Sequence, residues 1–583
     1  MYSPVPTTHF RRWPFSLGDA MVSGILVLII YGTISMAQRW TSGLQIDVPI
    51  DLGSRSLLLY SLLSLNRAMI AYVLSLIFTL VFGYWAGKSK TAERSILPLL
   101  DIGQSIPVLG FLPGLVLGLI SVFPRSNTGI ELACILMIFT GQVWNMAFSF
   151  YASVKAVPTQ FHELSANIML SPMQKLKDVE LPYSASGLAW NSLMSMAGGW
   201  FFLTVCEAFT LGDKQFRLPG LGSYMAVAIE KGDKMGMIKG VTAMIIVIVA
   251  VDFVLWRPII AWTRKFRLDE QSEESQDIPF MQLLYEDSRI SRILNYLGHY
   301  FWYAFGGISQ RVSDSFRGKL PKRKTKIFPL LVEIFDKIPN FVWMLFFIPI
   351  VIIIIGRLYL LLEPLKLPMV IQIISATLRT LVRVIFALGV SVVWTVPFAI
   401  WVGMSPKLTK FFQPLVQIAA SFPAPMLYPL VLGILATWKI DIGYSSAVLM
   451  LLGVQWYVLF NVLAGATTIS KELIDMYNLI GVSRLDAWKT LYIPSILPNL
   501  VTGVVTAVGG AWNASIVAEY MQYEGKTLAA NGLGSLISEA TAKGNYPMLG
   551  GGLVAMVVVV VALNNFVWRP LYAVVGRRYR FER

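Results

Sequence analysis

The sequence predicts an all-α integral membrane protein of about 12 transmembrane helices, arranged as two tandem, parallel repeats of six helices each. Two observations carry this prediction: a composition dominated by apolar residues, and a set of unlike residue types that recurs at fixed spacing. The 583-residue chain is 56% hydrophobic and 14% charged, whereas soluble domains contain about 25% charged residues. The same apolar content excludes a disordered chain.

Stretches of roughly 20 apolar residues can cross a bilayer. In the first half they lie at 18–36, 57–87, 97–123, 129–154, 184–206 and 237–262, and in the second at 339–362, 374–403, 411–436, 444–467, 497–518 and 548–574. No cleaved signal peptide is expected, because the first stretch is long enough to remain as a span. The predicted parts are an N-terminal tail (1–17), a first repeat (18–262), a linker (263–338), a second repeat (339–575) and a basic C-terminal tail (576–583).

An even number of spans puts both termini on one side of the membrane. Both tails and the loops after the second and eighth spans carry Lys or Arg, which marks the cytoplasmic side. The linker is then cytoplasmic too, with a charged loop at 264–287, an interfacial helix at 294–308 and a basic run at 319–326. The net charge of +15 is therefore a topology signal and does not indicate a nucleic-acid partner.

The internal repeat is visible in residues that chance apolar similarity would not align. Tryptophan, proline and acidic residues recur 312 positions apart, and upstream residues recur 316 positions apart. The pairs include Trp144 and Trp456, Trp200 and Trp512, Glu207 and Glu519, and, at the longer spacing, Arg67 and Arg383. Six spans per copy is an even number, so the two copies share one orientation.

Each repeat has a distinctive segment between its fourth and fifth spans, at about 155–182 and about 467–494. A carboxylate is followed six residues on by Gly or a substitute, and thirteen further on by a proline after an aliphatic residue. The residues are Glu163 and Asp475, Met169 and Gly481, and Pro182 and Pro494. The pattern predicts a short helix, a turn, a second short helix, and a proline in the first turn of the next span.

This pattern resembles the coupling loop of binding-protein-dependent ABC import permeases, more narrowly the nitrate, sulfonate and taurine type, in an internally duplicated form. The intramembrane arginine, a Ser-x-Pro opening the third span, the late glutamate of the fifth span and the following Gly-Leu-Gly are further features of that family, each present twice. The resemblance covers roughly 55–262 and 371–574.

The resemblance implies a permease subunit of a bacterial-type plasma (inner) membrane that forms the path of a small, anionic solute. The partners it implies are the lipid bilayer, two copies or a heterodimer of cytoplasmic ATPase subunits that bind ATP and Mg, and a periplasmic or extracellular solute-binding protein. It places Glu163, Ala166, Met169, Ser171, Pro182, Asp475, Gly481, Ser483 and Pro494 at the ATPase contact.

Two further expectations concern these segments. Met169 stands where the family has Gly, and a turn with positive φ favours Gly, so the first repeat is expected to turn differently or to dock more weakly. For the carboxylates, the alternative to coupling is that they cap a helix N-terminus.

Charged residues inside spans are candidates for the translocation path. Arg67 and Arg383 occupy equivalent positions, and guanidinium pairs well with oxyanions, although snorkelling to the outer interface is the alternative. Glu207 and Glu519 are also path candidates, with hydrogen bonding to backbone or arginine, or gating, as their expected role. The Gly-Leu-Gly that follows each glutamate is expected to mark a tight outer turn.

No enzyme activity is expected of this chain. Two cysteines and three scattered histidines offer no metal site. The nearest approach to a phosphate-binding loop, residues 83–89, is one residue short, so ATP hydrolysis is expected in a separate subunit and no cofactor in this one. The competing functions are a six-plus-six-helix secondary transporter driven by an ion gradient, for which intramembrane acid or histidine relays are sparse, and a membrane scaffold. Nitrate, sulfonate, taurine and bicarbonate all fit as solutes.

Overall fold

The fold is described from a computed structural model of the chain. It describes residues 16–105, 107–170, 172–211, 214–266, 280–293, 296–297, 349, 352–353, 355–523, 526–568, 570–571 and 574–575. Several predictions therefore lie outside the described residues: the coupling residue Ser171, the basic run at 319–326, both tails and most of the predicted span at 339–362.

Contacts divide the chain into two units. Unit 1 comprises 1–35, 153–190 and 250–339, and unit 2 comprises 36–152, 191–249 and 340–583. Unit 2 thus contains membrane helices of both sequence repeats, whereas the coupling segment of the first repeat belongs to unit 1.

The elements of the first half, in chain order, include two π turns within its long helices and one between α11 and α12. They are α1 (Leu17–Thr41), α2 (Ser54–Phe78), η1 (Thr79–Gly83), α3 (Tyr84–Lys88), α4 (Lys90–Ser105), η2 (Val108–Phe111), α5 (Leu112–Val122), α6 (Thr128–Lys155), α7 (Thr159–Asn167), α8 (Pro172–Lys175), η3 (Leu176–Glu180), α9 (Leu181–Cys206), β1 (Ala208–Leu211), β2 (Lys214–Arg217), α10 (Leu221–Glu230), α11 (Lys234–Val251), η4 (Asp252–Trp256), α12 (Arg257–Thr263), η5 (Arg264–Phe266) and α13 (Phe280–Asp287).

The second half repeats this order from its second span onward. Its elements are α17 (Leu367–Gly403), α18 (Pro406–Ser421), η6 (Ala424–Met426), α19 (Tyr428–Thr437), α20 (Ile442–Ala466), α21 (Lys471–Ile480), α22 (Arg484–Ala487), η7 (Trp488–Tyr492), α23 (Ile493–Ala518), β3 (Tyr520–Tyr523), β4 (Lys526–Ala529), α24 (Leu533–Ala542), α25 (Tyr546–Leu563) and η8 (Asn564–Trp568). The matching order confirms the internal repeat that the sequence predicts.

The predicted class, a helical multi-pass membrane protein, is confirmed. Among the described residues, 8 helices are long and apolar enough to cross a membrane, and three shorter apolar helices lie at Val108–Val122, Leu221–Glu230 and Tyr428–Thr437. The count of 12 spans stays a prediction.

Two predicted spans, 97–123 and 411–436, are wrong as continuous helices. Each breaks at the proline of its Ser-x-Pro: Pro107 (φ −69°, ψ 98°) separates α4 from η2, and Pro423 (φ −69°, ψ 107°) separates α18 from η6. Proline has no N–H to give to the preceding turn and disfavours the helical region for the residue before it. Ser-x-Pro therefore divides this span in two and does not open it.

Four other prolines lie within continuous helix, each preceded by a π turn that ends two residues before it. They are Pro182 after η3, Pro258 after η4, Pro494 after η7 and Pro570 after η8. A π turn widens the helix locally, which accommodates a residue that cannot donate to the turn before it. The second short helix of each coupling segment therefore runs directly into the next span, as one helix over Arg484–Ala518 in the second repeat, and is not the separate element that the sequence predicts.

The only strands among the described residues form two short hairpins, which the sequence does not predict. β1 pairs antiparallel with β2, with Ala208 opposite Arg217, and β3 pairs antiparallel with β4, with Tyr520 opposite Ala529. The Gly-Leu-Gly after each hairpin is not a tight turn: it opens a helix, α10 in the first repeat and α24 in the second.

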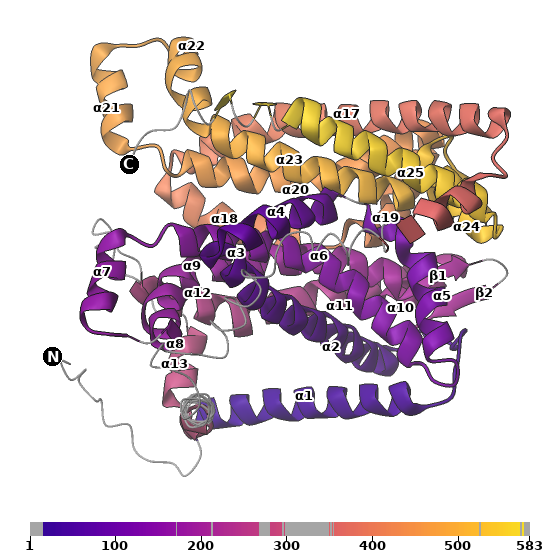
Figure 1. The fold of residues 1–583 in the computed structure, drawn as a ribbon, viewed down its shortest axis with the longest axis horizontal. Coiled ribbons are helices and arrows are strands. Elements are labelled where there is room, and N and C mark those ends of the chain that lie inside the picture. The colour runs from indigo at the N-terminus through magenta and orange to yellow at the C-terminus, as the bar shows by residue number, and fades with distance from the viewer. Residues whose placement is uncertain are drawn as a thin grey trace. The chain divides into compact units, whose positions relative to one another are not determined.

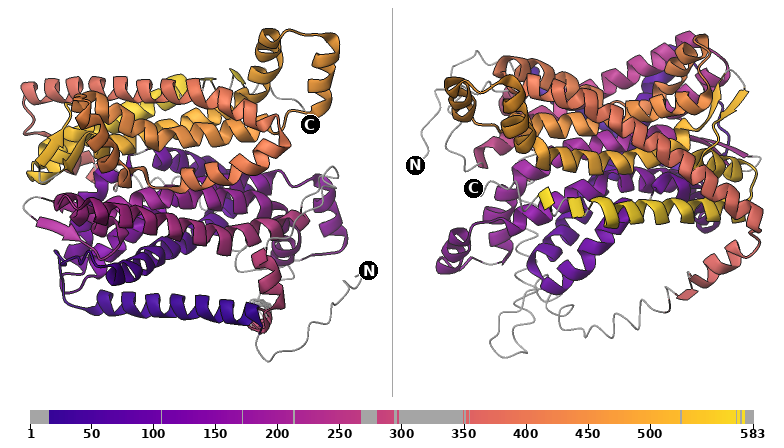
Figure 2. Two further views of the ribbon diagram at one scale, coloured as in Figure 1. Left: turned by 180° about the vertical axis from the view of Figure 1, so that it is seen from behind. Right: turned by 90° about the horizontal axis from the view of Figure 1, so that it is seen from above.

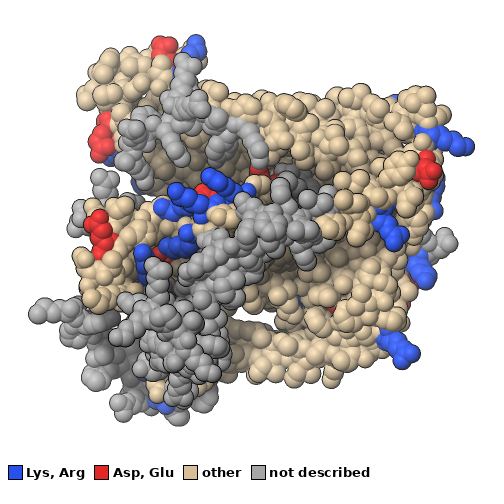
Figure 3. Space-filling view, in the orientation of Figure 1, with Lys and Arg blue, Asp and Glu red and all other residues tan. Residues whose placement is uncertain are grey.

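Within unit 2, α20 packs between α17 and α23 (Figures 1 and 2). Small residues make this possible: a Cβ added to Gly503 of α23 would lie 3.0 Å from the Cβ of Asn461 of α20, and small residues let membrane helices approach closely. Trp200 and Trp512, the paired tryptophans of α9 and α23, are buried. The flank of the second repeat carries almost no charged side chains, which gather at the ends of its helices (Figure 3).

In unit 1, part of the linker is ordered helix where the sequence predicts a loop. The predicted loop at 264–287 contains α13, whose Tyr285 hydroxyl donates to the carbonyl of Val254 at 2.8 Å. Just beyond α13, the carboxylate of Asp19 in α1 accepts hydrogen bonds from the Ser288 hydroxyl at 3.0 Å and the Arg289 N–H at 2.7 Å. These contacts hold the start of the linker against the start of the first span.

Candidate functional site

The coupling segment of the second repeat is a capped helix with a sharp end. Ser470 caps α21 by accepting from the N–H of Leu473 at 3.3 Å, and Gly481 ends it at φ 74°, in the left-handed region. Ser483 caps α22 in the same way, accepting from the N–H of Asp486 at 3.2 Å. In Figure 1, α21 and α22 project beyond the ends of α20 and α23.

The coupling segment of the first repeat makes the same turn without glycine. Met169 lies at φ 56°, and its N–H donates to Ala166 at 3.1 Å while the Leu170 N–H donates to Ser165 at 2.9 Å. The equivalent bonds in the second repeat run from Gly481 to Asn478 and from Val482 to Tyr477. The prediction that the first repeat turns differently is therefore wrong, although a side chain in this region costs about 1–2 kcal/mol.

Met169→Gly is accordingly expected to stabilise the protein by about 1 kcal/mol, because glycine adopts the left-handed region without the Cβ penalty. Thermal unfolding of the purified chain checks this as a rise in the midpoint. The matched control is Ile168→Gly, one residue earlier at φ −88°, which is expected to lower the midpoint. Equal shifts for both variants would contradict the explanation.

Both coupling segments carry an uncovered apolar tip. Leu479 is 87% exposed and Ile480 68% on α21, and Met169 is 84% exposed after α7. Apolar side chains gathered in this way beside polar ones mark interaction surfaces. Leu164 and Ile168 extend the tip of the first repeat.

The predicted carboxylates do not cap these helices. Glu163 is the fifth residue of α7, which has no acidic residue in its first turn, and Asp475 is the fifth residue of α21, whose first-turn acid is Glu472. Glu163, Asp475 and Ala166 are all exposed. The capping alternative is therefore wrong. Pro182 and Pro494 lie as predicted in the first turn of α9 and α23.

A second candidate site is a fully buried ion cluster in unit 2, in the first repeat. Nε and Nη2 of Arg67 donate side by side to the carboxylate of Glu131 at 2.6 and 2.7 Å, and Nη1 donates to Glu207 at 2.7 Å and to the carbonyl of Pro219 at 2.9 Å. Glu207 also accepts from the Ser64 hydroxyl at 2.7 Å. The side chain of Arg67 is 0% exposed, so the snorkelling alternative is wrong for this residue.

The second repeat holds a smaller version of this cluster. Arg383 Nη1 donates to Glu519 at 2.7 Å, and the Thr380 hydroxyl donates to the same carboxylate at 2.8 Å. Thr380 lies 316 positions after Ser64. Here the arginine side chain is 15% exposed, while that of Glu519 is 0% exposed.

Each cluster binds the start of the helix after the hairpin. Glu207 accepts from the N–H of Gly222 at 2.7 Å, and Glu519 accepts from the N–H of Gly534 at 2.8 Å. A Cβ at Gly222 would lie 2.4 Å from the backbone oxygen of Thr204, so only glycine allows this approach. The predicted hydrogen bonding of both glutamates to backbone and arginine is confirmed, and it ties the long helices α2 and α17 to α10 and α24.

Sequence reasoning missed three members of these clusters. Ser64 and Thr380 each precede their arginine by three residues, which places hydroxyl and guanidinium on one helix face. Glu131 was detectable as an acidic residue inside the predicted span at 129–154.

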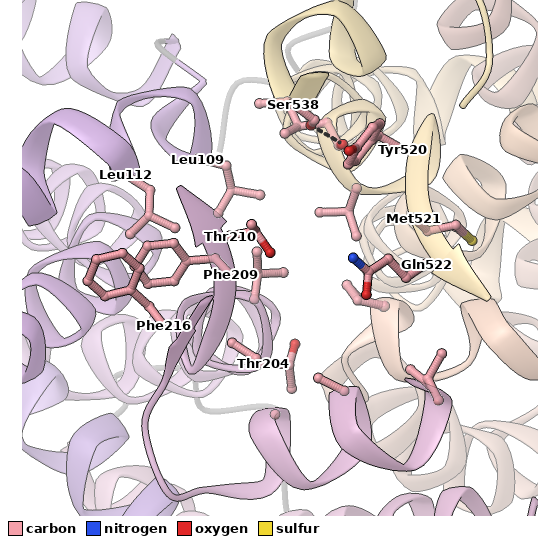
Figure 4. Close-up of a pocket in the computed structure, with 18 of the residues that line it drawn as sticks. Leu109, Leu112, Thr204, Phe209, Thr210, Phe216, Tyr520, Met521, Gln522 and Ser538 are labelled. Carbon is pink, nitrogen blue, oxygen red and sulfur yellow. Dashed lines mark hydrogen bonds between the residues drawn. The ribbon is translucent and has the colours of Figure 1, made fainter. Parts of the chain in front are cut away.

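Unit 2 also contains two cavities between segments of the two repeats. A cavity of about 310 Å³ lies between the hairpins, with Leu109, Phe209 and Phe216 on one side and Tyr520, Met521 and Gln522 on the other (Figure 4). A second, of about 160 Å³, lies deeper among α6, α9, α20 and α23. Its polar lining includes Gln104, Thr140, Asn145, Tyr457, Thr506 and Asn513.

Comparison with known proteins supports this architecture. The family model described as "Binding-protein-dependent transport system inner membrane component" matches residues 79–256 and again residues 395–581. The chain is similar to the taurine transport system permease protein TauC of Escherichia coli (strain K12), with 26% identity over 162 residues that cover 28% of this chain and 55% of that protein.

Two other similar proteins come from cyanobacteria. Identity to the nitrate import permease protein NrtB of Synechococcus elongatus is 26% over 123 residues (21% of this chain, 43% of that protein). Identity to the bicarbonate transport system permease protein CmpB of Synechocystis sp. is 28% over 144 residues (24% and 50%). The chain spans about half the length of these curated relatives. Since the family model matches more than half of the chain, in two successive copies, the protein belongs to the family of binding-protein-dependent transport system inner membrane components.

Proposed function

We propose that this chain is the transmembrane permease subunit of an ABC importer, with both membrane halves in one polypeptide. The observation that carries the proposal is the pair of coupling segments, each a short helix ended by a left-handed residue and tipped by exposed apolar side chains. The names of similar proteins, which include transport permeases for taurine, nitrate and bicarbonate, support a small anionic solute.

Cytoplasmic ATPase subunits, two copies or a heterodimer, would dock on these tips. The contact would be made by Glu163, Ala166, Met169, Ser171, Asp475, Gly481 and Ser483, with Pro182 and Pro494 where each segment enters the span. Because the second coupling segment continues into one helix over Arg484–Ala518, a rigid-body shift of the segment moves the whole fifth span. Closure of the ATPases around ATP thereby drives the change between two states of the path.

ATP and Mg would bind only to those partner subunits. The coupling segments and both termini would face the cytoplasm of a bacterial-type cell, and the hairpins, which follow the opposite ends of α9 and α23, would face a periplasmic or extracellular solute-binding protein. The cavity among α6, α9, α20 and α23 would lie on the solute path, where its amide and hydroxyl groups replace part of the solute's hydration. The family does not favour the alternative of a secondary transporter.

Uptake into vesicles tests the proposal. The chain is reconstituted with its ATPase and binding protein, and labelled nitrate, taurine, methanesulfonate and bicarbonate are supplied outside. Uptake of at least one solute is expected to require internal ATP and to persist when an ionophore collapses ion gradients. Uptake that needs an ion gradient but no ATPase would establish the alternative instead.

A further inference from the structure

The two arginine clusters differ at one position. In the first repeat the Nε–Nη2 edge of Arg67 is filled by the carboxylate of Glu131, at 2.6 and 2.7 Å. The residue 312 positions after Glu131 is Gly443, near the start of α20. A Cβ added to Gly443 would lie 3.2 Å from Nη2 of Arg383. Glycine therefore stands beside Arg383 where the first repeat has the second carboxylate.

This exchange leaves one edge of the Arg383 guanidinium open. Within the described part of the chain, its one ion pair runs from Nη1 to Glu519, and Nε and Nη2 have no hydrogen-bond partner there. The nearest other acid, Asp441, is engaged in capping α20, where its Oδ1 accepts from the N–H of Gly443 at 2.7 Å. The side chain of Arg383 is 15% exposed, against 0% for Arg67, so the open edge can be reached from outside.

We propose that the Nε–Nη2 edge of Arg383 binds a small oxyanion in the place that Glu131 occupies in the first repeat. The planar guanidinium fork matches two oxygens of a carboxylate, nitrate, sulfonate, bicarbonate or phosphate group. The first repeat supplies the template, since the same edge of Arg67 already holds two carboxylate oxygens.

The charge balance agrees with this assignment. The first cluster joins one arginine to two carboxylates, whereas the second joins one arginine to one carboxylate. A bound monoanion gives the second cluster the same balance as the first, which this fold already accommodates. The occupant is either a free solute anion or the phosphate of an anionic lipid headgroup, because both present the same oxygens.

The test needs neither ATPase nor binding protein, so it stands or falls separately from the proposed transport function. The full chain is placed in nanodiscs of neutral phosphatidylcholine, and its thermal midpoint is followed while nitrate or methanesulfonate replaces chloride at constant ionic strength. A saturable rise of about 2 °C or more is expected, because a ligand bound only to the folded state stabilises it.

Three variants locate the response. Gly443→Glu supplies the missing carboxylate from the chain itself and is expected to abolish the rise, as is Arg383→Gln, which removes the fork. Gly443→Ala is the matched control, since it leaves the edge open and is expected to keep the rise. A rise of wild-type size in Gly443→Glu or Arg383→Gln would overturn the proposal.

A second set of nanodiscs, containing phosphatidylglycerol, identifies the source of the anion. If the lipid headgroup is the occupant, wild type but not Gly443→Glu is more stable in these discs than in neutral ones, and added nitrate has no further effect. If a solute is the occupant, the nitrate or methanesulfonate rise is the same in both lipids. Absence of any Gly443-dependent difference in either lipid would refute the oxyanion site.

Discussion

Arg67→Met is expected to destabilise the protein by about 3–5 kcal/mol, the usual effect of removing one partner from a buried ion pair. Two carboxylates, Glu131 and Glu207, lose their common counter-ion, and both are buried. Domains are generally stable by only 5–15 kcal/mol, so much of the folded population is expected to disappear. Thermal unfolding and monodisperse yield in detergent measure the effect.

The second repeat supplies the comparison for this prediction. Arg383→Met is expected to cost less, because it strands one carboxylate, and Glu519 retains hydrogen bonds from Thr380, Gly534 and Ser535. Adding Glu131→Gln to Arg67→Met is expected to recover part of the loss by removing one of the two unpaired charges. Equal, small effects of both arginine variants, with no recovery, would contradict the buried-cluster explanation.

The largest functional effect is expected from a charge at the tip of a coupling segment. Leu479→Asp is expected to weaken ATPase docking by about 2 kcal/mol or more, roughly 30-fold, since an anchor side chain that fills a partner's pocket contributes on this scale. Because Leu479 is 87% exposed, folding is expected to be unchanged. Co-purification with the ATPase and ATP-driven uptake measure docking, and thermal unfolding checks the fold.

Met169→Asp makes the same test in the first repeat. Since Met169 and Gly481 form the same turn, a loss of similar size is expected, which would argue against weaker docking of the first segment. Met235→Asp is the control, because Met235 at the start of α11 is also exposed, at 61%, and lies outside both coupling segments. Uptake that survives Leu479→Asp and Met169→Asp together would show that the tips do not carry the coupling.

The coupling segments illustrate how far residue patterns reach. The short helix, its turn and the following proline depend on neighbours in the chain, so the pattern predicts them in both repeats. Its errors were also local ones: Met169 adopts the left-handed conformation despite its Cβ, and a π turn absorbs Pro182 and Pro494 within continuous helix. Competition between local preferences and the packing of a whole helix decides such cases.

The arginine clusters show the limit of that reasoning. Equivalent spacing singled out Arg67 and Arg383 as a pair, yet their surroundings differ. Arg67 meets Glu207 from 140 residues away and Glu131 from 64 residues away, and no periodicity predicts which distant side chains will converge. The exchange of Glu131 for Gly443 becomes meaningful only when both lie beside a guanidinium.

Hydropathy, proline and the repeat spacing were thus enough to predict a helical membrane protein of two like halves with two coupling segments, because each depends on composition or on short-range backbone preference. Folding in three dimensions decided which charge is sealed by carboxylates and which keeps an open edge, and it built the hairpins and cavities between the repeats. Those features arise from side chains far apart in the chain that must neutralise one another in an environment without water.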